Sequence, residues 1–140
     1  MERRWIEGAA AGMAGTAALS ATILAGKAVG RIPLSAPHEI SWRLHAKTGL
    51  PHRPIWLLGH YGYGAAAGLL FQAIRRLLPR SPLVAGAGYG LAVWAASYLW
   101  LMPRLGLYPK AAWDWPHRRR VMIAGHAVYG LVLALLSPRR

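Results

Sequence analysis

Four stretches without a charged residue divide the 140-residue chain, and basic residues, tryptophans and prolines gather at their ends. The stretches run from Gly8 to Gly26, Ile55 to Ile74, Leu83 to Met102 and Val121 to Leu136. Three contain 19 or 20 residues, which at about 1.5 Å per helical residue matches the ~30 Å hydrocarbon core of a bilayer. The fourth has 16 residues. The pattern predicts one transmembrane domain over residues 1–140, an all-α integral membrane four-helix bundle with spans at about 8–28, 55–77, 83–102 and 120–136.

Composition agrees with a membrane protein and excludes several other classes. Hydrophobic residues make up 55% and charged residues 15%, against ~25% charged in a typical soluble domain. The net charge is +13, but all 17 basic residues lie outside the four stretches. A nucleic-acid-binding protein would instead carry a basic face along a soluble fold, so we expect no nucleic-acid partner. The absence of cysteine excludes disulfides, thiolate zinc sites and redox dithiols.

Aromatic and basic residues mark the expected membrane–water interfaces. An indole prefers the headgroup level, with its ring in the apolar region and its N–H hydrated. Arginines beside a short span can extend to the headgroups. The candidate lipid-interface residues are Trp5, Trp42, Trp56, Trp100, Trp113, Trp115, Arg118, Arg119 and Arg120. Only Trp94 falls in the middle of a span. The alternative is that these tryptophans form the core of a soluble helical bundle, which would scatter them along the helices.

An internal repeat is indicated by one motif that occurs twice. Residues 59–64 and 125–130 both read G-H-x-x-Y-G, 66 residues apart. The first and third spans share a Gly/Ala-rich character and a following turn with proline. Two helices per unit predict parallel repeats, related by a pseudo-twofold axis along the membrane normal. Basic residues number seven on the side of the termini and ten on the other, which leaves the orientation open.

Glycines spaced as G-x-x-x-G predict close helix packing. Small residues let helix backbones approach in lipid, where the hydrophobic effect does not drive helix association. The candidate packing residues are Gly8, Gly12, Gly64, Gly68, Gly86 and Gly90. Contacts within one chain are the simpler interpretation, and a face for a homo-oligomer is the alternative.

A short amphipathic helix is expected at residues 37–48, between the first two spans. Pro37 and Glu39 suit its first turn, and Gly49 and Pro51 suit its end. Ile40 and Leu44 would form an apolar stripe opposite basic residues. We expect this helix to lie in the interface plane against anionic headgroups, with an ordinary solvated loop helix as the alternative.

Residues able to do chemistry are few. The four acidic residues lie outside the spans, and the sequence contains no nucleophile motif, phosphate-binding loop or H-E-x-x-H motif. His60 and His126 occupy equivalent positions of the repeat. Two facing imidazoles can bind haem iron or another metal, so both are candidate residues for a haem or pigment. The alternative is that each histidine makes a hydrogen bond between helices.

Several short motifs occur in an order shared with a known family. They are Gly59-His60, Met102-Pro103-Arg104-Leu105-Gly106-Leu107-Tyr108-Pro109, Trp113-Asp114-Trp115-Pro116 and Gly125-His126. In this region the chain resembles the YagU-like family of uncharacterised bacterial inner-membrane proteins. The resemblance implies a small multi-pass protein of the bacterial inner membrane with unassigned molecular function. It implies neither a catalytic site nor a cofactor.

These observations predict a non-enzymatic membrane protein that acts through helix packing and through contact with anionic lipid or a membrane partner, including a second copy of itself. One alternative is an oligomeric small channel or transporter, although few polar side chains lie in the spans to line a path. The other is a haem- or pigment-binding subunit that uses His60 and His126.

Overall fold

The computed structural model describes residues 2–30, 32 and 34–137, and every regular element among them is helical. The α-helices are α1 (Glu2–Ala28), α2 (Ala36–Thr48), α3 (His52–Ile74), α4 (Pro82–Ala95), α5 (Met102–Arg104) and α6 (Pro116–Leu136). A π-helix, η1 (Ala96–Leu101), joins α4 to α5, and a 3₁₀ turn, η2 (Ala111–Trp113), precedes α6. The prediction of an all-α protein is therefore confirmed.

Helix starts and stops follow local chemistry that is visible in the sequence. α2, α4 and α6 each carry a proline in their first turn, where its missing N–H and fixed φ cost nothing. Ser81 caps α4 by accepting a hydrogen bond from the backbone N–H of Val84. Gly49 ends α2 at φ 73°, a left-handed conformation that favours glycine. Gly30 after α1 and Gly106 after α5 adopt the same left-handed conformation, at φ 69° and 65°. The chain can therefore turn sharply after each of these three helices.

Three helical segments are long and apolar enough to cross a membrane: Glu2–Ala28 with 27 residues, Pro82–Arg104 with 23 and Pro116–Leu136 with 21. They correspond to the first, third and fourth predicted spans. α3 also has 23 residues, but His60, Tyr61 and Gln72 make it less apolar. The structure thus indicates a membrane protein, and the second predicted span, which corresponds to α3, remains a prediction.

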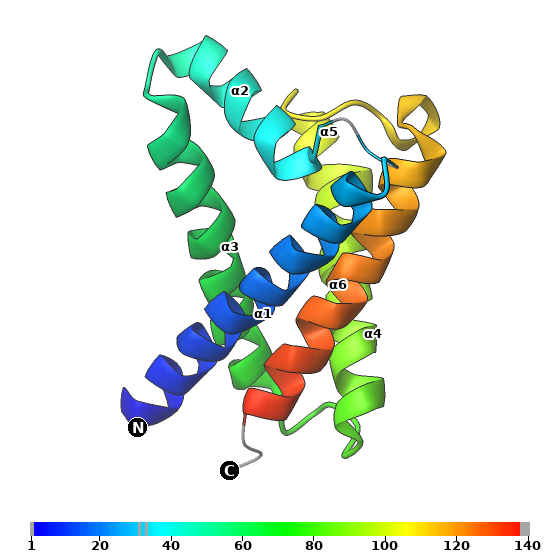
Figure 1. The fold of residues 1–140 in the computed structure, drawn as a ribbon. Helices are drawn as coiled ribbons and strands as arrows, with labels where there is room; N and C mark the ends of the chain where they lie inside the picture. Colours follow the sequence, from blue (N-terminus) through cyan, green and yellow to red (C-terminus); the bar gives the residue numbers. More distant parts are fainter. Residues whose placement is uncertain (1, 31, 33, 138–140) are drawn as a thin grey trace.

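Two helix pairs make up the body of the molecule (Figure 1). α1 packs on α3 and on α6, and α6 also packs on α4. The start of α1, the turn between α3 and α4, and the end of α6 lie at one end of the molecule. α2 and the connection between α5 and α6 lie at the other end.

Glycines bring the backbones into direct contact within each pair. In the first pair, a Cβ added to Gly12 would overlap the carbonyl oxygen of Gly64, and one added to Gly68 would overlap that of Gly8. In the second pair, a Cβ on Gly86 would overlap the carbonyl oxygen of Gly130. All six predicted packing glycines thus lie at contacts between helices.

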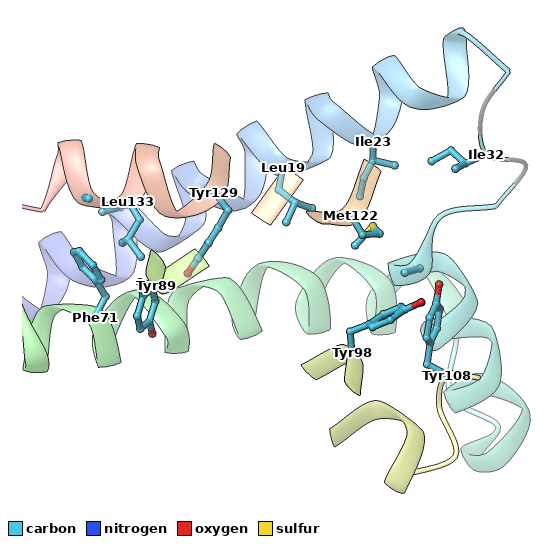
Figure 2. Close-up of a cluster of buried hydrophobic side chains, with 13 residues drawn as sticks. Leu19, Ile23, Ile32, Phe71, Tyr89, Tyr98, Tyr108, Met122, Tyr129 and Leu133 are labelled. Atoms are coloured by element: carbon cyan, nitrogen blue, oxygen red, sulfur yellow. The ribbon is translucent and has the colours of Figure 1, made fainter. Parts of the chain in front are cut away.

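Large side chains fill the space beside these contacts (Figure 2). Phe71 and Leu133 are fully buried. Tyr89 donates to the carbonyl oxygen of Ala67 at 2.6 Å, and Tyr129 donates to that of Gly64 at 2.9 Å. These two hydroxyls tie α4 and α6 to α3, while the exterior carries large apolar side chains such as Leu58 and Leu77. Small residues at the helix crossings and large apolar side chains on the exterior are the arrangement expected of helices packed in lipid.

Replacing Gly64 by alanine should lower the free energy of unfolding by about 2 kcal/mol, because the added methyl meets the Thr16 hydroxyl and the Gly12 carbonyl. Gly62→Ala in the same helix is the matched control, since nothing lies within 4 Å of its Cβ position. Thermal unfolding in detergent followed by tryptophan fluorescence measures both. Equal stability of the two variants would contradict the close α1–α3 contact.

Candidate functional site

A cavity of about 280 Å³ opens between the two helix pairs, beside the end that carries α2. α1, α3, α4, η1 and α6 form its walls, and α2 covers it. None of the described residues that line it is Lys, Arg, Asp or Glu. Most of the lining side chains that carry a polar group are tryptophan, tyrosine or histidine: Trp56, His60, Tyr63, Trp94, Tyr98, Tyr108, His126 and Tyr129. The cavity is an uncharged, mostly apolar chamber with a few hydrogen-bonding groups, which is typical of a small-molecule site.

α2 covers this cavity with the residues expected to face lipid. The predicted helix at 37–48 exists as Ala36–Thr48. Ile40 and Leu44, its apolar stripe, line the cavity together with Pro37. The expectation that this stripe lies against the bilayer is therefore corrected: it faces the interior of the protein, because the splayed upper ends of the two pairs leave apolar surface to cover. Lys47 donates to the Leu105 carbonyl oxygen at 2.9 Å and so holds the end of α2 to the turn that follows α5.

A buried ion-pair cluster holds α2 to the start of α6. Arg118 donates from Nη1 to Glu39 Oε2 at 2.6 Å and from Nε to Asp114 Oδ1 at 2.7 Å. Arg118 is only 6% exposed, so it does not extend to the headgroups as the sequence suggested. Its two carboxylate partners draw it inward instead, since a buried guanidinium needs compensating charge. Among the other two predicted interface arginines, Arg119 is half-buried and Arg120 is exposed.

Two tyrosines connect the ion-pair cluster to the cavity (Figure 2). Tyr98 and Tyr108 donate to Asp114 Oδ2 at 2.7 and 3.2 Å, and both line the cavity. Burial by itself raises the pKa of the Asp114 carboxyl, but the hydrogen bonds from Tyr98 and Arg118 outweigh it and hold that pKa below its usual value. Burial raises the pKa of the Tyr108 phenol. Asp114 is thus an ionised acceptor between two neutral tyrosines.

The π-helix places further hydroxyls on the cavity wall. Ser97, within η1, donates to the Val93 carbonyl oxygen at 2.8 Å. Its single proton is then used, so Tyr63 of α3 donates to Ser97 Oγ at 2.5 Å. This bond spans the two helix pairs. Short π-helical segments inside α-helices occur frequently at functional sites, and this one supplies both Ser97 and Tyr98 to the cavity.

His60 and His126 line the same cavity from different pairs. His126 donates from Nδ1 to the Met122 carbonyl oxygen at 2.8 Å, so in its neutral form Nε2 is the acceptor. His60 Nε2 lies 3.0 Å from Ser20 Oγ on α1, and its ring stacks on Trp56 at 6.1 Å between centroids. The structure thus brings both predicted histidines to one chamber and gives each a partner inside the protein. Within the described part of the chain, no group of three His, Cys, Asp or Glu residues could hold a metal ion.

Trp94 is the residue whose role the sequence analysis missed. It lines the cavity and stacks on Tyr98 at 5.1 Å. Its indole Nε1 is buried and has no hydrogen-bond partner among the residues that the structure describes. A buried donor without an acceptor is unusual. The sequence did set Trp94 apart, because it is the one tryptophan in the middle of a predicted span rather than at the end of one.

The predicted interface tryptophans lie on the exterior, with one exception. Trp5, Trp42, Trp100, Trp113 and Trp115 are all exposed. Three of them lie close to a cation, as shown by Arg4 at 5.4 Å from the Trp5 ring centroid, Arg104 at 4.9 Å from Trp100 and Lys110 at 5.8 Å from Trp113. Trp56 is half-buried, lines the cavity and stacks on His38 at 4.8 Å. Its ring therefore serves the cavity wall.

Asp114→Asn should lower the free energy of unfolding by about 3 kcal/mol at pH 7, because it leaves Arg118 with one buried carboxylate partner. The depressed pKa of Asp114 means that its stabilising charge is fully present above its usual pKa of about 3.9 and is lost as the pH falls through the lower folded value. The gap between wild type and variant should therefore shrink toward pH 3 in thermal unfolding.

The pair Arg3–Glu7, 3.2 Å apart with the Arg3 side chain 83% exposed, provides the control for this measurement. Glu7→Gln should change stability by less than about 1 kcal/mol, since water screens the pair. A variant Asp114→Asn that unfolds like the wild type at pH 7 would contradict the structural role of the cluster.

Comparison with protein families gives a match over almost the whole chain. The model of DUF6789, a family of unknown function, matches residues 2–139. No curated protein and no solved structure matches the chain. The expectation of an uncharacterised family is thus confirmed, although the matching model does not name the YagU-like family. The match covers nearly the whole chain, and the protein therefore belongs to DUF6789.

Proposed function

We propose that this protein binds a lipid-soluble molecule in the cavity between its two helix pairs, without catalysing a reaction on it. The observation that carries the proposal is the uncharged cavity of about 280 Å³, walled by long apolar helices and covered by α2. Well-packed interiors contain few voids larger than a water molecule. A chamber of this size, lined by aromatic and imidazole groups, favours an occupant.

The architecture in this proposal is a bundle of four transmembrane helices built from two parallel repeats. α1 with α3 and α4 with α6 are the repeated units, and the G-H-x-x-Y-G motif opens toward the cavity in both. Two observations support it. Glycine contacts lie at the crossing of each pair, where Gly12 meets Gly64 and Gly86 meets Gly130. Both within-pair connections also lie at the same end of the molecule.

The proposed location is the bacterial inner membrane, as the resemblance to YagU-like proteins implies. The exposed tryptophans with cations beside them would lie at the headgroup level. Exposed arginines near the helix ends, such as Arg120, would meet anionic lipid. The apolar exterior of the helices leaves room for a second copy or another membrane subunit as a partner.

Binding without catalysis fits the groups that line the chamber. Tyr63 donates to Ser97, and Ser97 donates to the Val93 carbonyl oxygen, so neither hydroxyl donates to a base among the described residues. Thr16 donates to the Gly12 carbonyl oxygen within its own helix. The same local hydrogen bonding argues against a channel, because it leaves few hydroxyls to line a wet path.

Filling the cavity should abolish binding. Val93 lines the chamber, so Val93→Trp is expected to lower the affinity for methylnaphthalene, a lipid-soluble probe, by at least about tenfold. Equilibrium dialysis of the protein in lipid nanodiscs measures this. Val128→Trp on the exterior of α6 is the control and should bind like the wild type.

A second filling variant guards against misfolding of the first. Leu44→Trp adds bulk from α2, on the opposite wall, and should have the same effect. Wild type and both filled variants binding the probe equally would contradict the proposal.

Haem or pigment binding is the second candidate, because His60 and His126 line one chamber. For the main proposal we expect an ultraviolet–visible spectrum with only tryptophan and tyrosine absorbance from protein purified in mild detergent. A Soret band that disappears in His60→Ala or His126→Ala would overturn it in favour of the cofactor.

A further inference from the structure

We propose that the cavity takes the end of one hydrocarbon chain of an anionic phospholipid, and that the chain enters sideways from the bilayer between α3 and η1. This inference rests on the proposed function and names the ligand and its route. It is built from an opening on one face of α3, from the apolar surface around that opening, and from cations beside the chamber that have no carboxylate partner.

One face of α3 is turned toward η1 and α4. Tyr63 donates to Ser97 Oγ of η1 at 2.5 Å. The Ala67 carbonyl oxygen accepts a hydrogen bond from Tyr89 of α4 at 2.6 Å. Gly59 lies one helical turn before Tyr63 and therefore on the same face of α3, nearer the end that carries α2.

Gly59 leaves an opening at this position. It lines the cavity and is also exposed on the exterior, and a Cβ added to it would meet nothing within 4 Å. In the second copy of the motif the equivalent glycine, Gly125, is buried, and its Cβ position lies 3.3 Å from the Leu19 side chain. Close packing thus accounts for Gly125 but not for Gly59. An opening from the cavity to the exterior accounts for Gly59.

The surface around this opening is apolar. The two segments that border it, Ile55–Ile74 and Leu83–Met102, contain no charged residue. Their exposed large side chains include Leu58 and Leu99. In the proposed arrangement of four spans the opening therefore faces hydrocarbon, and a hydrocarbon chain can enter without crossing a polar surface.

The volume and the chemistry of the chamber fit part of a chain. An engineered cavity of about 150 Å³ holds one benzene molecule, so about 280 Å³ gives room for roughly ten carbon atoms. None of the described lining residues is Lys, Arg, Asp or Glu, and an unpaired charge placed there would be strongly unfavourable. The headgroup and the remaining carbons of the lipid therefore stay outside.

Cations lie beside the chamber, where the headgroup would remain. Leu44 and Met102 line the cavity, and each is followed within one turn by a cation, Lys47 or Arg104. Lys47 bonds to the turn that follows Arg104, and Arg104 lies 4.9 Å from the ring centroid of the exposed Trp100. Neither cation has a carboxylate partner among the described residues. A lipid with net negative charge would supply the missing partner.

Photo-crosslinking tests the chain and its route. The probe is phosphatidylglycerol with a diazirine at the end of one acyl chain, in nanodiscs of phosphatidylcholine, and peptide mass spectrometry locates the label. Met122 reports on the chamber, because it lines the cavity and is only 5% exposed. Val128, exposed on the same helix, reports on contact with the surrounding bilayer. We expect label at both positions in the wild type.

Gly59→Trp should close the opening, since its side chain would project into unfilled space. Labelling at Met122 should fall about tenfold, and labelling at Val128 should not change. Gly62→Trp is the matched control, because Gly62 is exposed on α3, has nothing within 4 Å of its Cβ position and does not line the cavity. Thermal unfolding compares the stability of the two variants. Undiminished label at Met122 in a folded Gly59→Trp variant would overturn the route.

Arg104→Gln tests the headgroup. It should lower the labelling of Met122 by phosphatidylglycerol about fivefold, and it should not affect labelling by phosphatidylcholine that carries the same chain. Arg80→Gln removes an exposed cation at the opposite end of the molecule and is the control. Equal labelling of wild-type Met122 by the two lipids would overturn the anionic headgroup.

The possible results separate this inference from the proposed function. If methylnaphthalene binds the wild type but not Val93→Trp, while Met122 is labelled equally in both, the lipid chain is overturned and the lipophilic site stays in place. If neither the binding of methylnaphthalene nor the labelling of Met122 exceeds the level in Val93→Trp, both proposals are overturned together.

Discussion

Backbone contact between glycines is the constraint on which the rest of this structure depends. Gly12 meets Gly64 in one helix pair and Gly86 meets Gly130 in the other, so closely that no side chain fits between them. Two helices that touch at such a point cannot remain in contact along their full length, because larger side chains on either side separate them. α1 and α3 therefore diverge from their crossing toward the end that carries α2 (Figure 1). The cavity is a direct consequence of this geometry.

The splayed end is stabilised by polar chemistry. α2 lies over the opening, and Glu39 fixes it to α6 through Arg118, while Lys47 fixes it to the Leu105 carbonyl. Removing one member of a buried ion pair leaves the other uncompensated, which is strongly destabilising. The cluster thus gives α2 one position. Because Tyr98 and Tyr108 both touch Asp114 and line the cavity, the state of the cluster and the shape of the chamber are linked.

The hydroxyl and imidazole groups of the chamber are mostly engaged with the protein itself. Tyr129 and Tyr89 donate to carbonyl oxygens of α3, and Tyr63 donates to Ser97. Such bonds between helices are how polar residues are used inside a bilayer. Against this background the free indole N–H of Trp94 is the exception.

Local features were predictable from the sequence because local rules decide them. Apolar length located the long helices, and proline and glycine marked the ends of α2 and the starts of α4 and α6. The G-x-x-x-G spacing identified six glycines that lie at contacts but missed others, among them Gly130, which lies against Gly86. Two expectations were wrong for a common reason. Arg118 was expected at the headgroups, and Ile40 and Leu44 were expected against lipid, but all three face the protein interior. Each depends on a partner far away in the sequence.

The sequence by itself determined the helical class and the candidate spans, since length, hydrophobicity and turn residues act over a few neighbouring positions. It also brought His60 and His126 to attention through the repeated motif. Only the tertiary structure decided that Glu39, Asp114 and Arg118 meet and that Trp94 lines a chamber with no partner for its N–H. Those contacts depend on the angles at which the four helices cross and on how closely their backbones approach. Glycine spacing permits that crossing, and the packing of all the larger side chains around it sets the geometry.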